Sequence, residues 1–280
     1  MNQISLIDET YNSLNAEHYN VTIQILPESI SFSVLDTVRK KYVLLKNIPV
    51  EEEKQIPQEL SKLFESEELF KSKIGNLRAF VFTEKTTIVP SAFSSKENTA
   101  KFLTFNFGDN SIYDFQSCKT PFEATLAYSI PREIVELLNN KNCFSIYPLA
   151  LTLLNEAYKI SKSNQQSVTL NLLNNYAQLA VVVDGKLMLF NIFPYKTVED
   201  LSYFIVYLYD LFNLDKEKVS LTISGITEKN DKRIVNIQQF IKEVQFSKTN
   251  SQYIYSYRFN EIPQHQYSNH FILPYEDYKR

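Results

Sequence analysis

Residues 21–49 read VTIQILPESISFSVLDTVRKKYVLLKNIP, and this stretch decides the fold. β-Branched and aromatic residues dominate three runs within it, and short polar turns separate the runs. Runs of this composition favour extended chain bounded by turns. The stretch therefore predicts a meander of three strands, at 21–26, 30–35 and 41–48.

A helix and a fourth strand are expected after the meander. Apolar residues recur near helical spacing across 57–70, where Pro57 suits the first turn. The run LRAFVFT at 77–83 is almost entirely apolar and predicts a strand buried on both faces. A strand reached through a helical crossover must lie parallel to its neighbour by a right-handed connection, so the sheet is mixed, with helices on its faces.

The second half of the chain repeats this order. Asp184-Gly185 is a strong hairpin signal between two strand-like runs, and Thr197 with Asp200 has the spacing of a capping box. The predicted elements are strands at 167–173, 176–183 and 186–193, a helix at 198–212 and a strand at 219–223.

Two such units in tandem predict an α/β protein with mixed sheets, built as two lobes with a cleft between them. The first lobe is expected to span 1–165, with an insertion at about 86–145 and a connecting helix. The second lobe is expected to span 166–280, after the polar boundary KSNQQS at 162–167. Further elements are expected as strands near 86–89, 101–107, 111–116 and 123–129, helices at 131–139, 148–161 and 235–244, and a strand at 253–259 completing the second lobe.

Composition excludes several classes of function. The chain has 280 residues, with 29 basic and 32 acidic side chains and a net charge of −3. This balance provides no field strong enough to hold nucleic acid or an anionic membrane. No apolar run approaches the roughly 18 residues that a membrane span needs. We therefore expect a cytoplasmic protein without membrane insertion, although peripheral attachment through a partner stays open.

The cysteines and histidines do not form a recognisable site in the sequence. Cys118 and Cys143 are far apart and lack nearby ligands, so both are expected to be reduced and structural. His265 and His270 form the only close pair of histidines, and a catalytic zinc needs a third protein ligand. No metal site is expected.

The duplicated order resembles the actin-like ATPase superfamily, in which two ribonuclease H-like lobes bind nucleotide between them. Within that group, the chain is similar to a bacterial family of unknown function, distantly related to actin-like proteins of pilus assembly and type II secretion. The likeness lies in the meander, in LRAFVFTEKTTIVPSAFS at 77–94 and in YAQLAVVVDGKLMLFNIFPYKTVEDLSYFIVYLYDLF at 176–212. The resemblance implies two ribonuclease H-like lobes in an actin-like arrangement.

Active members of the superfamily carry Asp-x-Gly at the first hairpin of each lobe, close to metal and phosphate. Here the first hairpin reads Leu26-Pro27-Glu28-Ser29, without Asp or Gly, and Pro27 also lacks a backbone donor. The second hairpin reads Asn174-Asn175-Tyr176-Ala177, with a neutral amide and a bulky ring. The adenosine-side motif, a strand running into paired glycines, survives only as Ser224-Gly225.

The resemblance thus implies a degenerate cleft, whose positions are Glu28, Ser29, Asn174, Asn175, Ser224 and Gly225. Metal-assisted phosphoryl transfer needs carboxylates that hold the metal and N–H groups around the phosphates. Both turns have lost these elements, which predicts a pseudo-nucleotide site without catalytic residues. The simpler interpretation of Glu28 is a solvated turn residue, and that of Gly225 is a strand-end turn.

Three hypotheses of function follow. The first is a non-catalytic, pseudo-ATPase module that acts as a protein-interaction or assembly scaffold, with an unspecified protein partner and no cofactor. The alternative is a divergent ATP-binding protein or ATPase that uses magnesium through Glu28 and Asn174. A third is a small-molecule binder that uses the aromatic residues of the cleft, because 20 Phe and 18 Tyr offer large contact areas. Those aromatic residues are also explained by coverage of the sheet faces.

Overall fold

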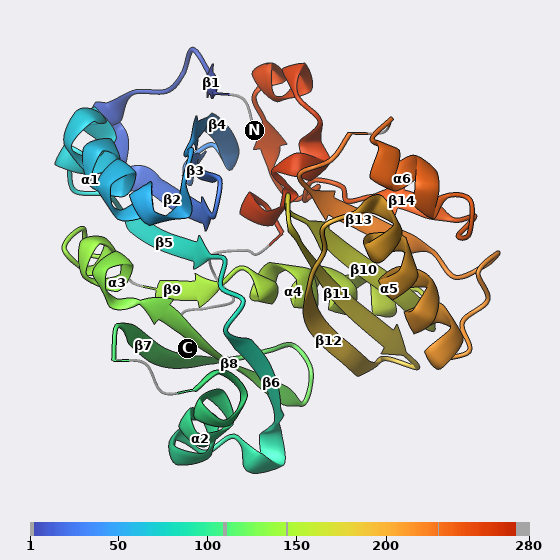
Figure 1. Cartoon of the computed structure of the whole chain (residues 1–280). Helices are drawn as coiled ribbons and strands as arrows, with labels where there is room; N and C mark the ends of the chain where they lie inside the picture. The colour runs from blue at the N-terminus through green and yellow to red at the C-terminus, as the bar shows by residue number, and fades with distance from the viewer. Residues whose placement is uncertain (1–2, 109–110, 144, 229, 273–280) are drawn as a thin grey trace.

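The computed structural model describes residues 3–108, 111–143, 145–228 and 230–272 (Figure 1). Its strands are β1 (Ile4–Ile7), β2 (Tyr19–Leu26), β3 (Ser29–Asp36), β4 (Lys41–Pro49), β5 (Asn76–Val81), β6 (Thr86–Pro90), β7 (Tyr113–Lys119), β8 (Ala124–Pro131), β9 (Ser145–Pro148), β10 (Gln166–Leu172), β11 (Tyr176–Val183), β12 (Lys186–Pro194), β13 (Leu221–Gly225), β14 (Val244–Phe246) and β15 (Ile254–Tyr255). Its α-helices are α1 (Ile56–Ser66), α2 (Lys96–Phe107), α3 (Arg132–Asn139), α4 (Ala150–Ser161), α5 (Val198–Leu211) and α6 (Lys232–Ile237).

Two of the sheets share one strand order. The first runs β1-β4-β3-β2-β5-β9 and the second runs β12-β11-β10-β13-β14, so the last five strands of the first match the second one for one. In both, the three meander strands are antiparallel and the last two are parallel to the first meander strand. A β-bulge interrupts corresponding strand pairs, at Val34/Leu35 and at Val181/Val182. The mixed α/β fold and its duplicated order are confirmed.

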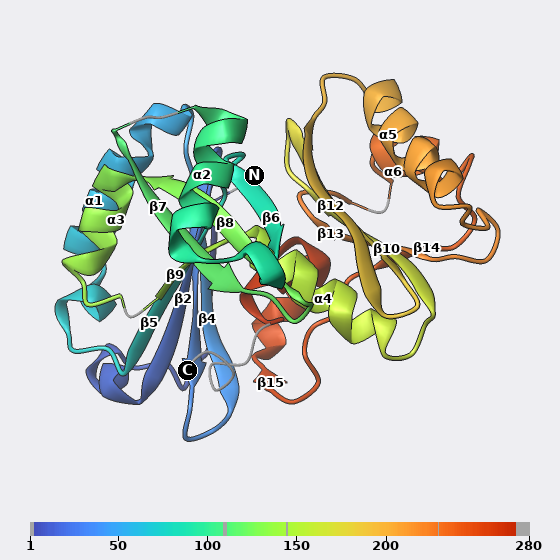
Figure 2. The same cartoon turned by 90° about the horizontal axis from the view of Figure 1, so that it is seen from below.

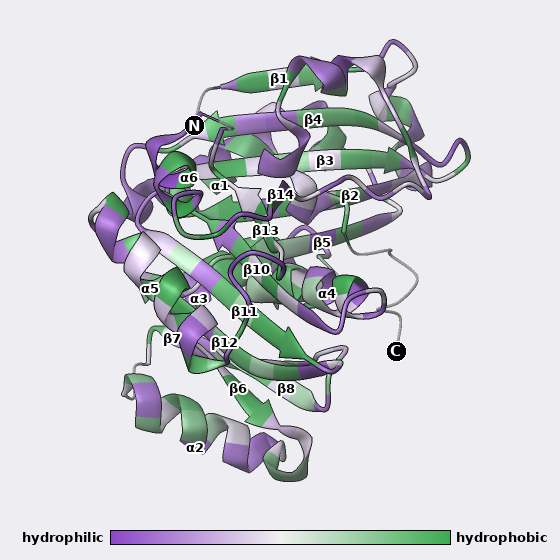
Figure 3. Cartoon of the chain, turned by 90° about the vertical axis from the view of Figure 1, so that its right-hand side faces the viewer, coloured by the Kyte–Doolittle hydropathy of each residue, from purple (hydrophilic) through white to green (hydrophobic). Residues whose placement is uncertain are grey.

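Helices cover the outer face of each sheet. Figures 1 and 2 show α1 and α3 beside the first sheet, and α5 and α6 beside the second. Leu60 and Leu63 of α1 are buried against the first sheet. Leu201 and Ile205 of α5 are buried in the same way against the second sheet. The capping box predicted at the start of α5 is present, because Thr197 and Asp200 bond each other's backbone N–H. Figure 3 shows hydrophobic residues along β10 and β11 beneath these helices.

The strand predicted at 101–107 is wrong, because this stretch lies in α2. Ser95 caps the helix by accepting the backbone N–H of Asn98. The sequence KFLTFNF alternates apolar and polar residues near its end, which favours a strand by pattern. In the helix only Thr99 and Leu103 are buried, so no apolar stripe of helical period marks it.

Two predictions near the C-terminus also need correction. The helix expected at 235–244 is the shorter α6, and β14 then adds a parallel strand to the second sheet. The strand expected at 253–259 is reduced to β15. It does not complete the second lobe, because Ile254 and Tyr255 pair with β4 of the first sheet. Tertiary packing with a distant strand, rather than local pattern, decides this placement.

The insertion forms a third sheet against the first lobe, in the order β6-β8-β7. On one face, Leu126 and Ile130 of β8 join the core of the first lobe. The Tyr128 hydroxyl there donates to the carbonyl of Ile146, at 2.8 Å. On the other face, Leu103 of α2 packs against the sheet. The insertion is thus an extension of the first lobe.

The helix α4 joins the two large sheets. It packs on β10 and β11, on the face of the second sheet opposite α5. Glu156 of α4 is buried and accepts a hydrogen bond from the hydroxyl of Ser247, a residue that follows β14. Burial raises the pKa of Glu156 to about 7, so this link carries an ionisable group in the physiological range.

Residues 254–272, here called the C-terminal segment, return to the first lobe. Three single turns of 3-10 helix follow β15, at Tyr257–Glu261, Gln264–Gln266 and Ser268–His270. Phe271 packs edge-to-face on Tyr42 of β4, with ring centroids 4.6 Å apart. Tyr42, Phe259 and Phe271 belong to a small core separate from those of the two lobes. In Figure 1 the segment lies between the two large sheets.

We expect Phe271→Ala to lower the free energy of unfolding by about 3–5 kcal/mol, because it removes a buried ring and leaves a cavity. Phe105→Ala is the matched control, since the Phe105 ring is 87% exposed on α2. The control should shift stability by no more than about 0.5 kcal/mol. Urea denaturation of both variants measures the difference. A loss in Phe271→Ala as small as that of the control would show that the Phe271 ring of the C-terminal segment does not stabilise the fold.

Candidate functional site

The first hairpin turns of the two lobes touch each other. The backbone N–H of Asn174, between β10 and β11, lies near enough to the Glu28 carboxylate, between β2 and β3, to lower its pKa against the larger, raising effect of burial. The Oε1 atom of Glu28 is buried without a hydrogen-bond partner among the described residues. Burial raises the pKa of Glu28, because desolvation disfavours the charged form. Glu28 thus lies in the turn, as the simpler interpretation has it, but its side chain is half-buried rather than fully solvated.

Ser29 and Asn175 lie next to this contact but face different surroundings. Ser29 is buried as the first residue of β3 and pairs with Pro49 of β4. Asn175 is exposed, and its carbonyl accepts the backbone N–H of Tyr195 at 3.0 Å. Both residues therefore shape the turns through their backbone.

Ser224 and Gly225 end β13 in a closely packed position. The Ser224 hydroxyl lies 3.3 Å from Oδ1 of Asn171 and 3.4 Å from the carbonyl of Leu170. Gly225 has φ of +89°, and a Cβ atom there would lie 2.2 Å from the carbonyl oxygen of Leu172. Backbone packing thus requires glycine at this position, which supports its interpretation as a strand-end turn.

An arginine that the sequence analysis missed lies beside these strand ends. Arg233 of α6 donates to the Tyr195 hydroxyl at 2.6 Å and to the Ile226 carbonyl at 2.7 Å. It also forms an ion pair with Asp231, and this partner lowers the pKa of the Asp231 carboxyl against the effect of burial. The guanidinium is thus engaged by protein groups. A cavity of about 640 Å³ opens next to it and is also lined by Tyr267 of the C-terminal segment.

The C-terminal segment bonds to the inner faces of both large sheets. Asn269 donates to Asn171 of β10 at 3.1 Å and accepts from Thr152 of α4 at 2.9 Å. His270 is hydrogen-bonded to the Ser31 hydroxyl of β3 at 2.8 Å. Burial, reinforced by Arg78, lowers the pKa of His270 to about 3, so its ring is neutral. The segment therefore links the lobes across the space between them.

The cysteines are free thiols. Burial raises the pKa of Cys143 to about 12 and that of Cys118 further, so neither is a ready thiolate. Within the described ranges, no three His, Cys, Asp or Glu side chains are grouped to hold a metal ion.

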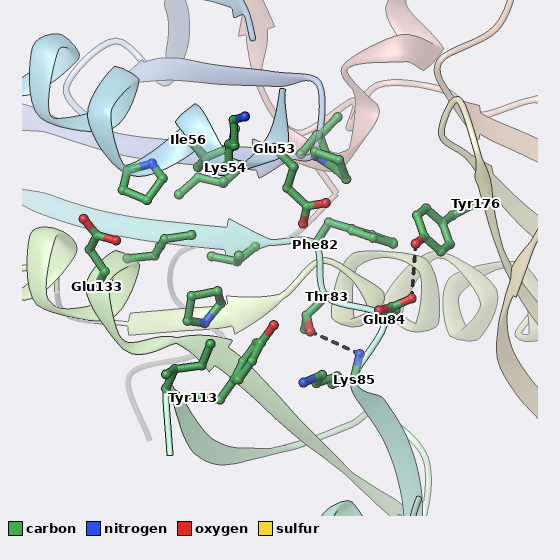
Figure 4. A pocket seen from close by; sticks show the side chains of 18 residues that line it. Glu53, Lys54, Ile56, Phe82, Thr83, Glu84, Lys85, Tyr113, Glu133 and Tyr176 are labelled. Carbon is green, nitrogen blue, oxygen red and sulfur yellow. Dashed lines mark hydrogen bonds between the residues drawn. The ribbon is translucent and has the colours of Figure 1, made fainter. Parts of the chain in front are cut away.

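A second cavity, of about 520 Å³, opens at the ends of β2 and β5. Figure 4 shows its labelled side chains, among them Glu53, Phe82 and Tyr113 from the first lobe and Tyr176 from the second. The Tyr176 hydroxyl donates to Glu84 at 3.1 Å, across the two lobes. The six positions predicted from the sequence line neither this cavity nor the one beside Arg233.

Strand order and facing hairpins define the class of protein as one with an actin-like ATPase fold. A crystal structure of a Bacteroides thetaiotaomicron protein with actin-like ATPase fold and unknown function matches at a TM-score of 0.76, with 14% identity over 85% of this chain and 94% of that one. The PilM–PilN type IV pilus biogenesis complex matches at a TM-score of 0.58, with 10% identity over 90% of this chain and 95% of that one. At these identities the likeness shows the fold alone.

The chain belongs to the DUF3822 family, whose members are described as proteins of unknown function. The family model matches residues 8–244. The cytoplasmic domain of EpsL from the type II secretion system of Vibrio cholerae also matches, at a lower TM-score of 0.44, with 10% identity over 85% of this chain and 88% of that one. No curated protein matches the chain. The resemblance drawn from the sequence is confirmed.

The structure brings together only part of the predicted site. Glu28 and Asn174 are in contact, whereas Ser224 and Gly225 pack beneath the end of β10. The sequence analysis missed Arg233 and the residues around the 520 Å³ cavity. The hairpin pattern located the turns, but no local pattern indicates which distant side chains lie beside them.

We expect Gly225→Ala to lower the free energy of unfolding by more than about 2 kcal/mol, because positive φ and a backbone clash act together. Gly185→Ala is the control, since Gly185 has φ of +73° but no atom within 4 Å of the position that a Cβ atom would take. It should cost only about 1–2 kcal/mol, from the left-handed backbone. Thermal unfolding of both variants tests this, and indistinguishable losses would exclude the clash with Leu172.

We expect Glu28→Gln to flatten the fall in stability with rising pH. The pKa of Glu28 is higher in the folded than in the unfolded protein, so the folded state binds more protons between the two values. Stability from this group is therefore present below the unfolded pKa and is lost as pH rises through the folded pKa. Urea midpoints from pH 4 to pH 8 measure the slope. An unchanged slope in Glu28→Gln, compared with the exposed control Glu97→Gln, would contradict the buried carboxyl.

Proposed function

We propose that this protein is a non-catalytic, pseudo-ATPase module of the actin-like fold that acts as a protein-interaction or assembly scaffold. The observation that carries the proposal is the contact between Glu28 and the backbone of Asn174. It places a carboxylate between the turns that hold phosphates in active relatives. Negative charge on this carboxylate opposes phosphate binding at this point.

The neighbouring groups do not fit ATP with magnesium either. Pro27 offers no backbone donor in the first turn. The guanidinium of Arg233 is bonded to Asp231, Tyr195 and Ile226, so a phosphate would have to displace these partners. We therefore derive no catalytic step for this cleft and expect no cofactor.

Among the classes of partner, a protein fits such a scaffold best. A structural neighbour, PilM, is named in complex with PilN, which supports protein binding on this fold. The near-neutral charge gives no support to nucleic acid as the partner. Within the described residues, no helix is long and apolar enough to cross a bilayer. We propose that the protein works in the cytoplasm, with any membrane association made through its partner.

A divergent ATP-binding protein or ATPase is the second candidate. Its support is the Oε1 atom of Glu28, a buried carboxylate oxygen without a partner among the described residues. Such an oxygen is a suitable ligand for magnesium. This candidate requires the Glu28 carboxylate to turn from Asn174 towards a metal.

Isothermal titration calorimetry of high micromolar protein with ATP and MgCl₂ tests the two candidates. The scaffold proposal expects no binding heat and no phosphate release above a blank without protein. Tight, magnesium-dependent binding that is lost in Glu28→Gln would overturn it in favour of the second candidate. Glu97→Gln, on the exposed side of α2, serves as the matched control.

A further inference from the structure

The 520 Å³ cavity at the ends of β2 and β5 has aromatic walls from both lobes. The rings of Phe82 and Tyr176 lie with centroids 5.0 Å apart at an angle of 45°. Tyr113, which begins β7, lines the cavity from the insertion. The volume of the cavity falls in the range of about 300–1,000 Å³ that is typical of small-molecule sites. The cavity thus offers ring faces to a group of the size of an amino-acid side chain.

Two carboxylates lie beside these rings. Figure 4 shows the Glu53 carboxylate pointing towards Phe82 and Tyr176, while Glu84 accepts the Tyr176 hydroxyl at 3.1 Å. Both glutamates are exposed at the mouth of the cavity. Partial desolvation, with the nearby Glu84 carboxylate as the second cause, raises the pKa of Glu53, as expected for two acidic groups that repel each other. A positive charge between them would relieve this repulsion.

The cations of the cavity do not provide that charge. Lys54 forms an ion pair with Glu52, which is outside the cavity lining. The Lys85 ammonium lies 3.7 Å from the centroid of the Tyr113 ring, on another wall. Among the described residues, none places a cation within ion-pair distance of Glu53. The contact of Lys85 with Tyr113 also shows that a ring of this cavity already accommodates an ammonium group.

We propose that this cavity binds an organic cation, namely an ammonium or guanidinium group on an alkyl stem. Ring faces attract such a charge, and Glu53 and Glu84 neutralise it while the stem packs on apolar wall residues such as Phe82. The same carboxylates repel the phosphates of a nucleotide. The proposal goes beyond a scaffold role, which needs no ligand at this position.

Calorimetric titration with N-acetyl-arginine amide and N-acetyl-citrulline amide tests the proposal. The two probes have almost the same shape, but only the first carries a charge. We expect saturable binding of the arginine derivative and at least about tenfold weaker binding of the citrulline derivative, in line with a desolvated cation–π contact. Equal affinity for both probes, or no binding of the arginine derivative, would overturn the proposal.

Variants locate the binding. The double variant Glu53→Gln/Glu84→Gln should weaken the arginine derivative by at least about tenfold, because both neutralising charges are lost. Both residues are exposed enough for substitution, and circular dichroism checks the fold. Glu97→Gln should bind as the unaltered protein does. Affinity retained in the double variant would place the cation elsewhere and refute this site.

The cation has two possible sources, a free small-molecule cation or a basic side chain of a protein partner. n-Butylguanidine and an end-blocked Gly-Arg-Gly peptide separate them, since each carries one guanidinium and no other charge. Tighter binding of n-butylguanidine assigns the site to a free cation, and tighter binding of the peptide assigns it to a partner's side chain. The ATP titration is independent of this test, because a nucleotide could bind and overturn the scaffold role while the cation result still stands.

Discussion

Both faces of the central strands are buried, so the polar side chains of the inner faces need partners inside the protein. On the first sheet, Arg78 is only 1% exposed, and its Nε donates to the Thr22 hydroxyl at 3.1 Å. On the second sheet, Asn171 accepts from Asn269. An unsatisfied buried polar group costs about 1–3 kcal/mol, so these partners are needed for the lobes to pack. The C-terminal segment provides several of them and thereby ties the two sheets together.

This constraint bears on the cleft. The lobes meet at Glu28 and Asn174 and again at Tyr176 and Glu84, so contacts between protein groups occupy the positions around the hairpins. The space that remains has aromatic walls and acidic groups. An active site for phosphoryl transfer needs the opposite arrangement, with donors and cations directed at the phosphates. The cation that we propose for this space would complement those acidic groups.

The duplicated lobes differ at their sheet edges and in the connection from β5 to β9, which carries the insertion in the first lobe. The first sheet is extended beyond the meander by β1 and β15, which both pair with β4. In the second sheet, β12 takes the position of β4, and it pairs only with β11 among the described strands. The core strands, by contrast, keep the same order and the same position of the bulge. Divergence therefore lies at the outer strand and in one crossover connection, where added chain leaves the order of the five shared strands unchanged.

Periodic segments were predictable because burial repeats along them. The meanders, the capped helix α5 and the hairpin at Asp184-Gly185 were all predictable from spacing and turn chemistry. The stretch of α2 misled the pattern, because only Thr99 and Leu103 of that helix are buried. Burial on so small a face leaves no helical period in the residues.

The sequence by itself therefore determined the order of elements within the two repeated units, their duplication and the lack of Asp-x-Gly at either hairpin, since each follows from residues close together in the chain. Tertiary structure alone decided that Ile254 pairs with Lys41, that Arg233 lies beside Tyr195, and that rings from two lobes form one cavity. These contacts join residues far apart in the sequence or on different elements. Their energies depend on side-chain packing and on desolvation after the lobes meet. Neither effect produces a periodic pattern in the local sequence.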